Sequence, residues 1–314
     1  MMTSYDFSTT RDGLIKGALR VLGIIKAGTN PPTSLVTDCA EALNMMIKMW
    51  QAEEIGLWLN KTIYVFLQYA TASFRLGPSG DHATSSYVVT TLSADADTAA
   101  TTITVTSTTG IATAYYIAVE LDDETLQWST VSGTPSGYVV TLATALTGDA
   151  SSGNTVYCYQ TKTQRPLQIL EASILDSDDN EIPIPIVSDN EYWNMSDKTT
   201  TGNPNIIYYD PQTTNGVLYI WPTNDNVDNV LKLKIKYPLA DLDSATDNPD
   251  FPIEWAEAIK FNLALRLAPE LMDDIAEDRM KYILEMARES KRNAQGFDAE
   301  LNTSIYFQPD LDSY

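Results

Sequence analysis

The chain has 314 residues, and its 42 Asp and Glu outnumber its 20 Lys and Arg, so that the formal net charge is −22. Such a charge repels nucleic acid over most of a protein's surface, which argues against a DNA-gripping protein. His82 is the one histidine, which excludes catalysis by several histidines. No apolar run approaches the ~18 residues of a spanning helix, and the first residues lack the pattern of a secretory signal, so we expect neither feature.

A first helix is predicted from apolar residues at helical spacing between Leu14 and Ile25. Thr9 or Thr10 can cap its amino end. The run Gly-Thr-Asn-Pro-Pro at residues 28–32 must end the helix, because proline donates no amide hydrogen and restricts the residue before it.

A second helix is expected after Ser34, its predicted cap, with an apolar stripe from Val36 to Trp50. Gly56 is its expected end. Two such stripes joined by a short turn form a helical hairpin, whose apolar faces need a further partner.

Helical spacing returns near the carboxyl end of the chain. One helix begins near Trp255 and is expected to end at Pro269. A last helix runs from Met272 to Ala287 and loses its pattern by Gly296.

Residues 85–160 have the profile of a small all-β sandwich or barrel. No Lys or Arg occurs between Leu76 and Thr161, whereas Thr, Ser, Val and Tyr dominate and glycines punctuate the segment. Cys158 lies here and Cys39 in a helical stripe, so two buried thiols are expected rather than a disulfide. Strands are expected at 101–105, 116–120, 138–142 and 155–159.

The segments 61–84 and 161–248 are also β-rich, with a proline-punctuated composition. The residues from Asp176 to Glu181 begin like a calcium loop but lack Gly at the sixth position and Glu at the twelfth, so a hairpin tip is expected instead. Asn-Gly at residues 215–216 has the chemistry of another hairpin turn. Strands are expected at 61–67, 167–175, 182–187, 206–209, 217–221 and 230–237.

The sequence lacks the motifs of the common enzyme classes. It has no glycine-rich phosphate loop, paired-cysteine zinc pattern, H-E-x-x-H or G-x-S-x-G motif, so we expect no enzyme, no cofactor and no metal. His82 lies in a turn-like region and is expected to be an exposed loop residue. Lys232, Lys234 and Lys236 alternate along one strand, which indicates a solvated face or contact with an acidic neighbour.

The fold class predicted from these patterns is α+β. Neither helical hairpin can bury its stripe alone, so both chain ends are expected to form one discontinuous four-helix bundle into which the β region is inserted. The predicted parts are the helical bundle (1–60 and 249–295), the β-rich body (61–84 and 161–248), the inserted all-β module (85–160) and an extended C-terminal arm (296–314).

The arm is either a disordered terminus or a segment that orders against a partner subunit. It is more apolar than a solvating tail requires, so ordering against a partner is at least as well supported as disorder. Its candidate partner-binding residues are Phe297, Leu301, Ile305, Tyr306 and Phe307.

Three stretches resemble the head-to-tail adaptor proteins of short-tailed bacteriophages, which are also called packaged-DNA stabilisation or tail accessory proteins. Residues 10–23 resemble the opening helix of that family. Residues 42–56 are similar to its Leu-x-x-Met-x-x-x-Trp pattern ending in Gly, and residues 252–269 to its Leu-Ala-x-x-x-Ala-Pro helix. The large β insertion departs from the smallest members and is similar in style to the β regions of larger tail-tube adaptors.

The resemblance implies a structural virion protein of the tail or neck, made in the host cytoplasm. It would form a ring, typically of twelve copies, below the portal, closing the DNA-filled head and passing DNA through its lumen without reading its sequence. The helical part would contact the portal protein, the arm would run along neighbouring subunits, and the β parts would meet the tail nozzle or fibres. No membrane partner is implied.

The charge fits such a conduit. Twelve chains with a formal charge of −22 per chain give the ring a total of −264. An acidic lumen repels phosphates rather than holding them. We therefore expect acidic residues to outnumber basic ones on the lumen wall.

Two alternatives from other functional classes stay open. Abundant carboxylates together with Trp128, Trp193 and Trp221 would suit a carbohydrate-binding or glycan-cleaving protein, since glycosidases need two carboxylates across a sugar cleft. The chain could instead be an adhesin of the tail fibre itself. Fibre adhesins are usually trimers, so the mass of the assembly distinguishes them from a ring.

Overall fold

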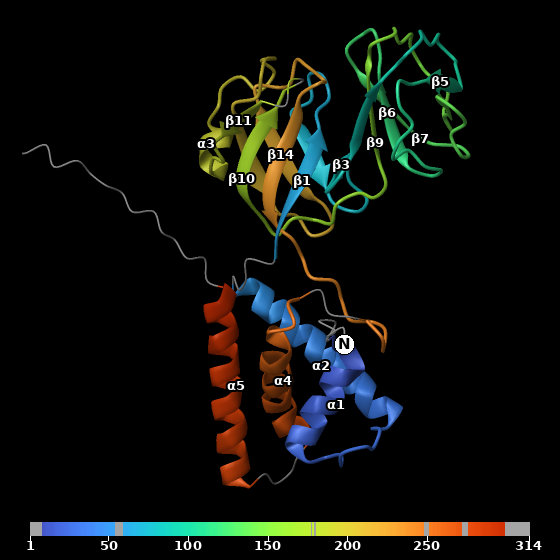
Figure 1. Cartoon of the computed structure of the whole chain (residues 1–314). Helices are drawn as coiled ribbons and strands as arrows, with labels where there is room; N and C mark the ends of the chain where they lie inside the picture. The colour runs from blue at the N-terminus through green and yellow to red at the C-terminus, as the bar shows by residue number, and fades with distance from the viewer. Residues whose placement is uncertain are drawn as a thin grey trace, which may run out of the picture. The chain divides into compact units, whose positions relative to one another are not determined.

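The computed structural model describes residues 8–53, 59–176, 178, 180–247, 251–271 and 276–298. These ranges confirm the expected α+β class, with five helices and several antiparallel sheets. Contacts divide the chain into a helical unit, Met1–Leu59 with Leu239–Tyr314, and a β unit, Asn60–Pro238. In Figure 1 the blue helices of the amino end and the orange and red helices of the carboxyl end belong to the same unit. No helix in these ranges has both the length and the apolar character needed to traverse a bilayer.

The helical unit contains α1 and α2 from the amino end and α4 and α5 from the carboxyl end. Thr10 caps α1, because its hydroxyl oxygen accepts a hydrogen bond from the Gly13 amide at 3.2 Å. Gly23 ends α1 in the left-handed region at φ 79°, a conformation that favours glycine. The helices span Arg11–Leu22, Thr33–Ala52, Trp255–Leu271 and Glu277–Asp298.

Helix α4 is the central element of this unit and contacts α1, α2 and α5. Apolar side chains from the four helices form one buried core, in which the rings of Trp50 and Trp255 have centroids 5.7 Å apart. The Asn262 side-chain amide donates to the Ala287 carbonyl at 2.9 Å, which ties α4 to α5. Packing against α4 therefore buries apolar stripes from both ends of the chain.

Two expected boundaries at the amino end are wrong. Ser34 does not cap α2, which begins at Thr33 and has Pro32 at its cap position without a side-chain hydrogen bond. Proline suits a helix start because its missing amide hydrogen would have no helical partner there. Ile25 lies beyond α1, because the left-handed Gly23 has already turned the chain away.

The other two expected helix ends are Pro269 for α4 and Gly56 for α2. Pro269 lies inside α4, which continues to Leu271, since a proline so close to the carboxyl end removes one helical hydrogen bond without undoing the turn. Helix α2 ends at Ala52, and the expected end at Gly56 lies outside the described residues, as does Met272, the expected start of the last helix.

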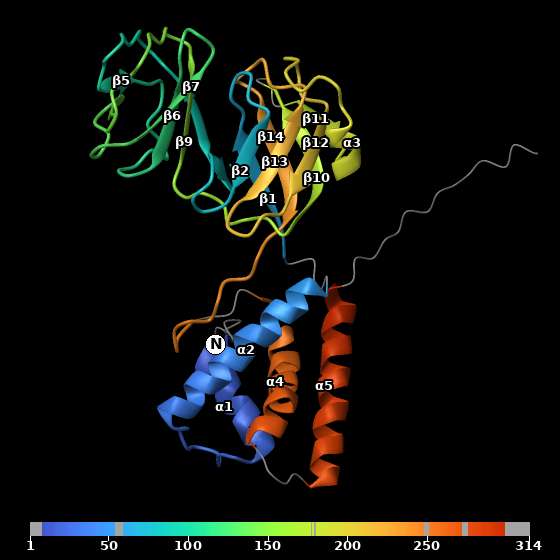
Figure 2. The same ribbon diagram turned by 180° about the vertical axis from the view of Figure 1, so that it is seen from behind.

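The body of the β unit consists of two antiparallel sheets packed face to face (Figure 2). One has the order β11-β10-β14-β1-β3 and the other β12-β13-β2. Alternate residues such as Ile63, Leu218 and Leu233 point inward and form the buried core between the sheets. The strands are β1 Asn60–Phe66, β2 Ser73–Leu76, β3 Ala83–Thr84, β10 Gln168–Leu175, β11 Glu181–Ile184, β12 Ile206–Asp210, β13 Gly216–Trp221 and β14 Val230–Lys236.

A short helix, α3 (Asp189–Trp193), covers part of the outer face of the three-stranded sheet. Ser188 and Glu191 form a capping box at its amino end. The buried ring of Tyr192 lies 5.8 Å from that of Tyr208 and 5.1 Å from that of Tyr219, measured between centroids. Helix α3 is thus fixed to the sheet by aromatic contacts.

Residues 85–160 form a closed ring of six strands. β4 pairs with β9, β9 with β6, and β6 with β7. A bridge between Val131 and Leu142 leads from β7 to β8, β8 pairs with β5, and a bridge between Leu92 and Val105 returns to β4. Every strand therefore has two neighbours. The strands are β4 Val88–Thr91, β5 Thr102–Thr104, β6 Tyr116–Glu120, β7 Leu126–Thr130, β8 Val139–Thr141 and β9 Thr155–Tyr159.

Cys39 and Cys158 are both buried and free, as expected from the sequence. Burial raises the pKa of Cys39 to about 11 and that of Cys158 to about 12. Both thiols therefore stay protonated near neutral pH and act as small apolar residues.

Candidate functional site

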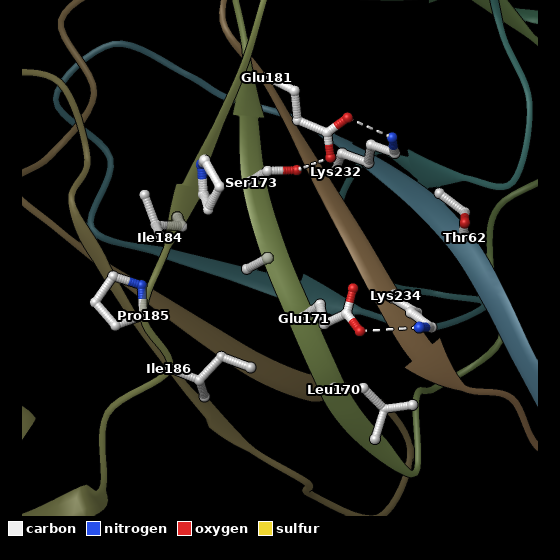
Figure 3. A pocket seen from close by; sticks show the side chains of 12 residues that line it. Thr62, Leu170, Glu171, Ser173, Glu181, Ile184, Pro185, Ile186, Lys232 and Lys234 are labelled. Carbon is white, nitrogen blue, oxygen red and sulfur yellow. Dashed lines mark hydrogen bonds and ion pairs between the residues drawn. The ribbon is translucent and has the colours of Figure 1, made fainter. Parts of the chain in front are cut away.

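A shallow groove of about 650 Å³ lies on the outer face of the five-stranded sheet (Figure 3). Strand β10 forms its floor, the edge strand β11 one side, and lysines of β14 the other side. Its lining residues are Thr62, Leu170, Glu171, Ala172, Ser173, Glu181, Pro183, Ile184, Pro185, Ile186, Lys232 and Lys234.

One end of the groove is organised by Glu181. Lys232 Nζ lies 2.7 Å from Glu181 Oε2, and the Ser173 hydroxyl donates to Glu181 Oε1 at 2.6 Å. The hydrogen bond from Lys232, followed by that from Ser173, lowers the pKa of Glu181, while the same carboxylate raises the pKa of Lys232. Both groups therefore carry their charges at neutral pH.

A second ion pair follows two residues along β14, on the same face of the sheet. Lys234 Nζ lies 2.9 Å from Glu171 Oε1. The acidic neighbours that Lys232 and Lys234 meet are thus glutamates of the same sheet, and Figure 3 shows both pairs spanning from β14 toward β10 and β11.

The open edge of the groove is protected against strand pairing. Strand β11 is at the end of its sheet, and Pro183 lies opposite Ser173 in the ladder with β10. Pro183 and Pro185 carry no amide hydrogen, so an incoming strand finds few donors along this edge. Ile182 and Ile186 nevertheless remain 47% and 39% exposed. The edge therefore offers side-chain contacts rather than a backbone ladder.

The charged side chains of the groove are paired with one another. A general acid needs a raised pKa, whereas the pKa of Glu181 is lowered and its carboxylate is held by Lys232. In the part of the chain that the structure describes, no group of three or more His, Cys, Asp or Glu gathers into a metal site. The surface of the groove therefore consists of Lys–Glu ion pairs and apolar side chains.

A second notable region is the joint between the six-stranded module and the body. Phe66 of β1 lies at its centre, with its ring centroid 5.0 Å from that of Tyr157 and 5.2 Å from that of Trp128. Tyr87 and Tyr159 pack on the same ring at 5.3 and 5.7 Å. Phe66 is 2% exposed, so the module is attached through a dry aromatic core.

His82 belongs to this joint. It lies in a loop before β3, as expected, but its ring is largely covered and not exposed. Its imidazole stacks on Trp128, and its Nδ1 lies 2.7 Å from the Tyr159 hydroxyl. Burial lowers the pKa of His82 to about 3, with a smaller effect from the nearby charge of Lys162. The ring is therefore neutral at physiological pH and serves as a packing element.

Polar contacts complete the joint. The side chain of Gln68 donates to the Leu126 carbonyl at 2.8 Å and accepts from the Leu126 amide at 3.2 Å. It thus makes the two hydrogen bonds that a neighbouring strand would make with Leu126. The Thr155 hydroxyl donates to Asp228 at 2.7 Å, and its amide donates to Glu120 at 2.8 Å. Burial raises the pKa of Glu120, which is otherwise lowered by that bond to Thr155. The module is held by side chains, not only by its two connecting segments.

The sequence analysis did not identify this joint, although a signal was present. Tyr64 and Phe66 in β1, and Tyr157 and Tyr159 in β9, are aromatic residues two positions apart, the spacing of one strand face. Two aromatic faces in separate β segments can be expected to meet. Their pairing could not be assigned, because many strands in this chain carry aromatic residues.

The structure places the predicted site residues as follows. Phe297 falls within α5, but its side chain is not described, and Leu301, Ile305, Tyr306 and Phe307 lie outside the described residues. The segment after Asp176 is a hairpin tip, as expected, because Asp176 Oδ1 accepts the amides of Asp178 and Asn180 at 2.9 Å each.

No protein-family model matches the chain, and no curated protein sequence matches it.

Proposed function

We propose that this chain is a head-to-tail adaptor of a short-tailed bacteriophage, a structural protein of the virion neck. Helices of both chain ends would act as a discontinuous four-helix bundle that docks on the portal. The body and the six-stranded module would dock the tail nozzle or fibres. A ring of copies, twelve by resemblance to that family, would close the filled head and pass DNA through its lumen.

One observation supports this arrangement above the others. The first residue of β1, Asn60, pairs with Lys236 at the end of β14, so the β unit starts and finishes at neighbouring positions of one sheet. The segments on both sides of it, Met1–Leu59 and Leu239–Tyr314, belong to one unit. A β unit that is inserted in the sequence of a helical unit suits a protein that contacts different partners with different parts.

The charge of the chain supports a conduit. A formal charge of −22 per copy disfavours adhesion to DNA, which would slow its passage. The groove and the joint add surfaces for protein contacts. The pKa of Glu181 in the groove is lowered, and Glu120 of the joint, whose pKa is raised by burial, accepts a hydrogen bond from the Thr155 amide.

The test is to mix the purified chain with portal rings of the virus that encodes it and image the product. Twelve chains of 34.7 kDa would add about 416 kDa to the ring. An adaptor gives a stoichiometric second ring whose lumen wall has more acidic than basic residues. A complex without ring symmetry, or a basic lumen, contradicts the proposal.

A carbohydrate-binding protein is the second candidate, favoured by one surface feature. Trp193 is 53% exposed and packs against Tyr219 with ring centroids 5.6 Å apart. Aromatic faces of this kind can stack on sugar rings. Binding to a glycan array that disappears with Trp193→Ala, in a chain that ignores portal rings, would favour this candidate over the adaptor.

A further inference from the structure

Helix α5 carries a row of charged side chains on the face opposite its buried one. Ile283 and Ala294 belong to the core of the helical unit, in which α5 packs on α4 (Figure 1). On the opposite face, intervals of three and four residues bring six exposed charged residues into one row. We call this row the charged stripe, and its members are Asp278, Lys281, Glu285, Arg288, Glu289 and Arg292.

The two arginines of the charged stripe are available to a partner. Among the described residues, neither Arg288 nor Arg292 forms an ion pair, although the chain has 42 acidic and 20 basic side chains. Lys281 does form one there, with its Nζ 3.5 Å from Glu277, but an exposed pair of this kind contributes little. A guanidinium keeps its charge and pairs best with a planar carboxylate. The stripe therefore offers positive charges that a carboxylate from outside the chain can neutralise.

A shallow hollow of about 580 Å³ lies along the same face of α5. Five members of the charged stripe line it, with the half-buried Leu284 between them. The long side chains of lysine and arginine also present apolar stems beside their charged ends. A helix seated in this hollow would therefore meet apolar groups as well as charges.

The order of signs makes the charged stripe complementary to its own reverse. From the amino end of α5 the charges run negative, positive, negative, positive, negative, positive. From the carboxyl end every sign is the opposite, so two α5 helices laid antiparallel place each charge against one of opposite sign. All facing pairs share a midpoint near residue 286, and one register therefore satisfies them together. These pairs are Asp278 with Arg292, Lys281 with Glu289, and Glu285 with Arg288.

We propose that the free chain forms a two-fold dimer through antiparallel contact of two α5 helices along the charged stripe. A formal charge of −22 makes most faces of two copies repel each other. The stripe has three charges of each sign, so two copies can approach one another there, and its pattern fixes their orientation. This inference does not rest on the proposed adaptor function.

A second copy suits the stripe better than other occupants. Against a different face of the same chain, which has two acids for each base on average, the three acids of the stripe would be repelled. A protein of other sequence would need the same alternation at helical spacing, which a second copy has already. In a ring with a single rotation axis neighbours meet through two different surfaces, so the two-fold contact belongs to the chain before any such assembly.

Sedimentation velocity of the full chain tests the dimer directly. Two chains of 34.7 kDa give a species of about 69 kDa. We expect a dissociation constant of roughly 10–100 µM at low salt, because exposed ion pairs each contribute little. Added sodium chloride should weaken the dimer by screening these pairs.

Charge reversal at the centre of the stripe should weaken the dimer. Arg288→Glu and Glu285→Arg each place like charges at two symmetric positions, so we expect at least a roughly tenfold weaker association for either variant. The matched control is Glu41→Arg at an exposed position of α2, which makes the same change of charge away from α5 and should dimerise at least as well as the natural chain. Circular dichroism checks that all variants are folded.

Mixing the two reversed chains gives the decisive measurement. In a heterodimer of Arg288→Glu with Glu285→Arg, both contacts between positions 285 and 288 again join opposite charges. The equimolar mixture should therefore associate to within about threefold of the natural chain, although neither variant does so alone. A helix merely weakened by either substitution would not recover on mixing.

Each other result overturns the proposal. A natural chain that stays monomeric at several hundred micromolar removes the second copy as the occupant. A dimer that neither reversal weakens lies on another surface, and a mixture that does not recover excludes the antiparallel register. Growth beyond the dimer that either reversal suppresses would show a contact between different faces instead. Binding to portal rings is measured separately, so the adaptor function can stand or fall by itself.

Discussion

The imidazole of His82 lies flat on the indole of Trp128, with ring centroids 3.6 Å apart and an angle of 2° between the planes. One residue comes from the body of the β unit and the other from the inserted module, so this stack is part of the contact that joins them. It depends on a neutral histidine, because an imidazolium would bring a charge into an aromatic core.

The stability of the β unit should therefore fall in acid. The pKa of His82 is about 3 when folded and about 6.5 when unfolded, so the unfolded chain binds the proton first as the pH drops. The contribution of the neutral His82 to the free energy of unfolding is complete above about pH 6.5 and is lost progressively between about pH 6.5 and 3. Urea unfolding at pH 7.5, 6.5 and 5.5 measures this effect above the range in which most carboxylates titrate.

The control is His82→Asn, which keeps a polar side chain but does not titrate. Its free energy of unfolding should be lower at pH 7.5 and flatter between pH 7.5 and 5.5 than that of the natural chain. Parallel curves for the two proteins would show that His82 is not the titrating group.

Removing the central ring of the joint should loosen the module. Phe66→Ala deletes a buried side chain that contacts rings of both parts, so we expect a loss of about 3–5 kcal/mol in the free energy of unfolding. Guanidinium unfolding measures the loss, and limited proteolysis should cut the connections to the module sooner. Tyr138→Ala, at a 62% exposed position of the module, should change stability by less than about 0.5 kcal/mol.

Trp255 should be essential to the helical unit. It is 1% exposed and contacts Trp50, so Trp255→Ala should destabilise this unit by about 3–5 kcal/mol. Hydrogen exchange should report the loss in helices from both chain ends together, because they share one core. Faster exchange confined to α4 and α5 would contradict that coupling, and Tyr282→Ala serves as the exposed control.

The edge of the five-stranded sheet should pair with other copies of the chain once a backbone N–H donor is introduced there. Pro183→Val adds a donor and a residue with high strand propensity at strand β11. We expect concentration-dependent association of this variant, detectable by analytical ultracentrifugation. Glu171→Gln, at a surface ion pair on the same face, should leave the chain as monodisperse as before and change stability by less than about 1 kcal/mol.

Long periodic segments were the most predictable part of the fold. The stripes of α1, α2, α4 and α5 and the strand runs around Ile63 and Leu233 are strong signals, and the corresponding elements are present. Strands β2, β3, β4 and β7 and helix α3, none of which has more than five residues, were missed.

The candidate sites were harder to predict, for a reason seen in His82. A single residue in a turn-like segment has no periodic neighbours that reveal its burial, and the covering Trp128 is distant in sequence. The groove poses the same difficulty, since Glu171, Glu181 and Lys232 come together only through strand order. The alternating lysines were visible in the sequence, but their glutamate partners were not.

The ring of six strands has a consequence for any assembly that concentrates many copies of this chain. Its pairings are completed within one polypeptide, as the bridges at Leu92–Val105 and Val131–Leu142 show. Each junction between its four-stranded and two-stranded sheets is one bridge long. Edge-to-edge pairing of crowded modules would compete with these bridges, which disfavours their fusion into a continuous sheet.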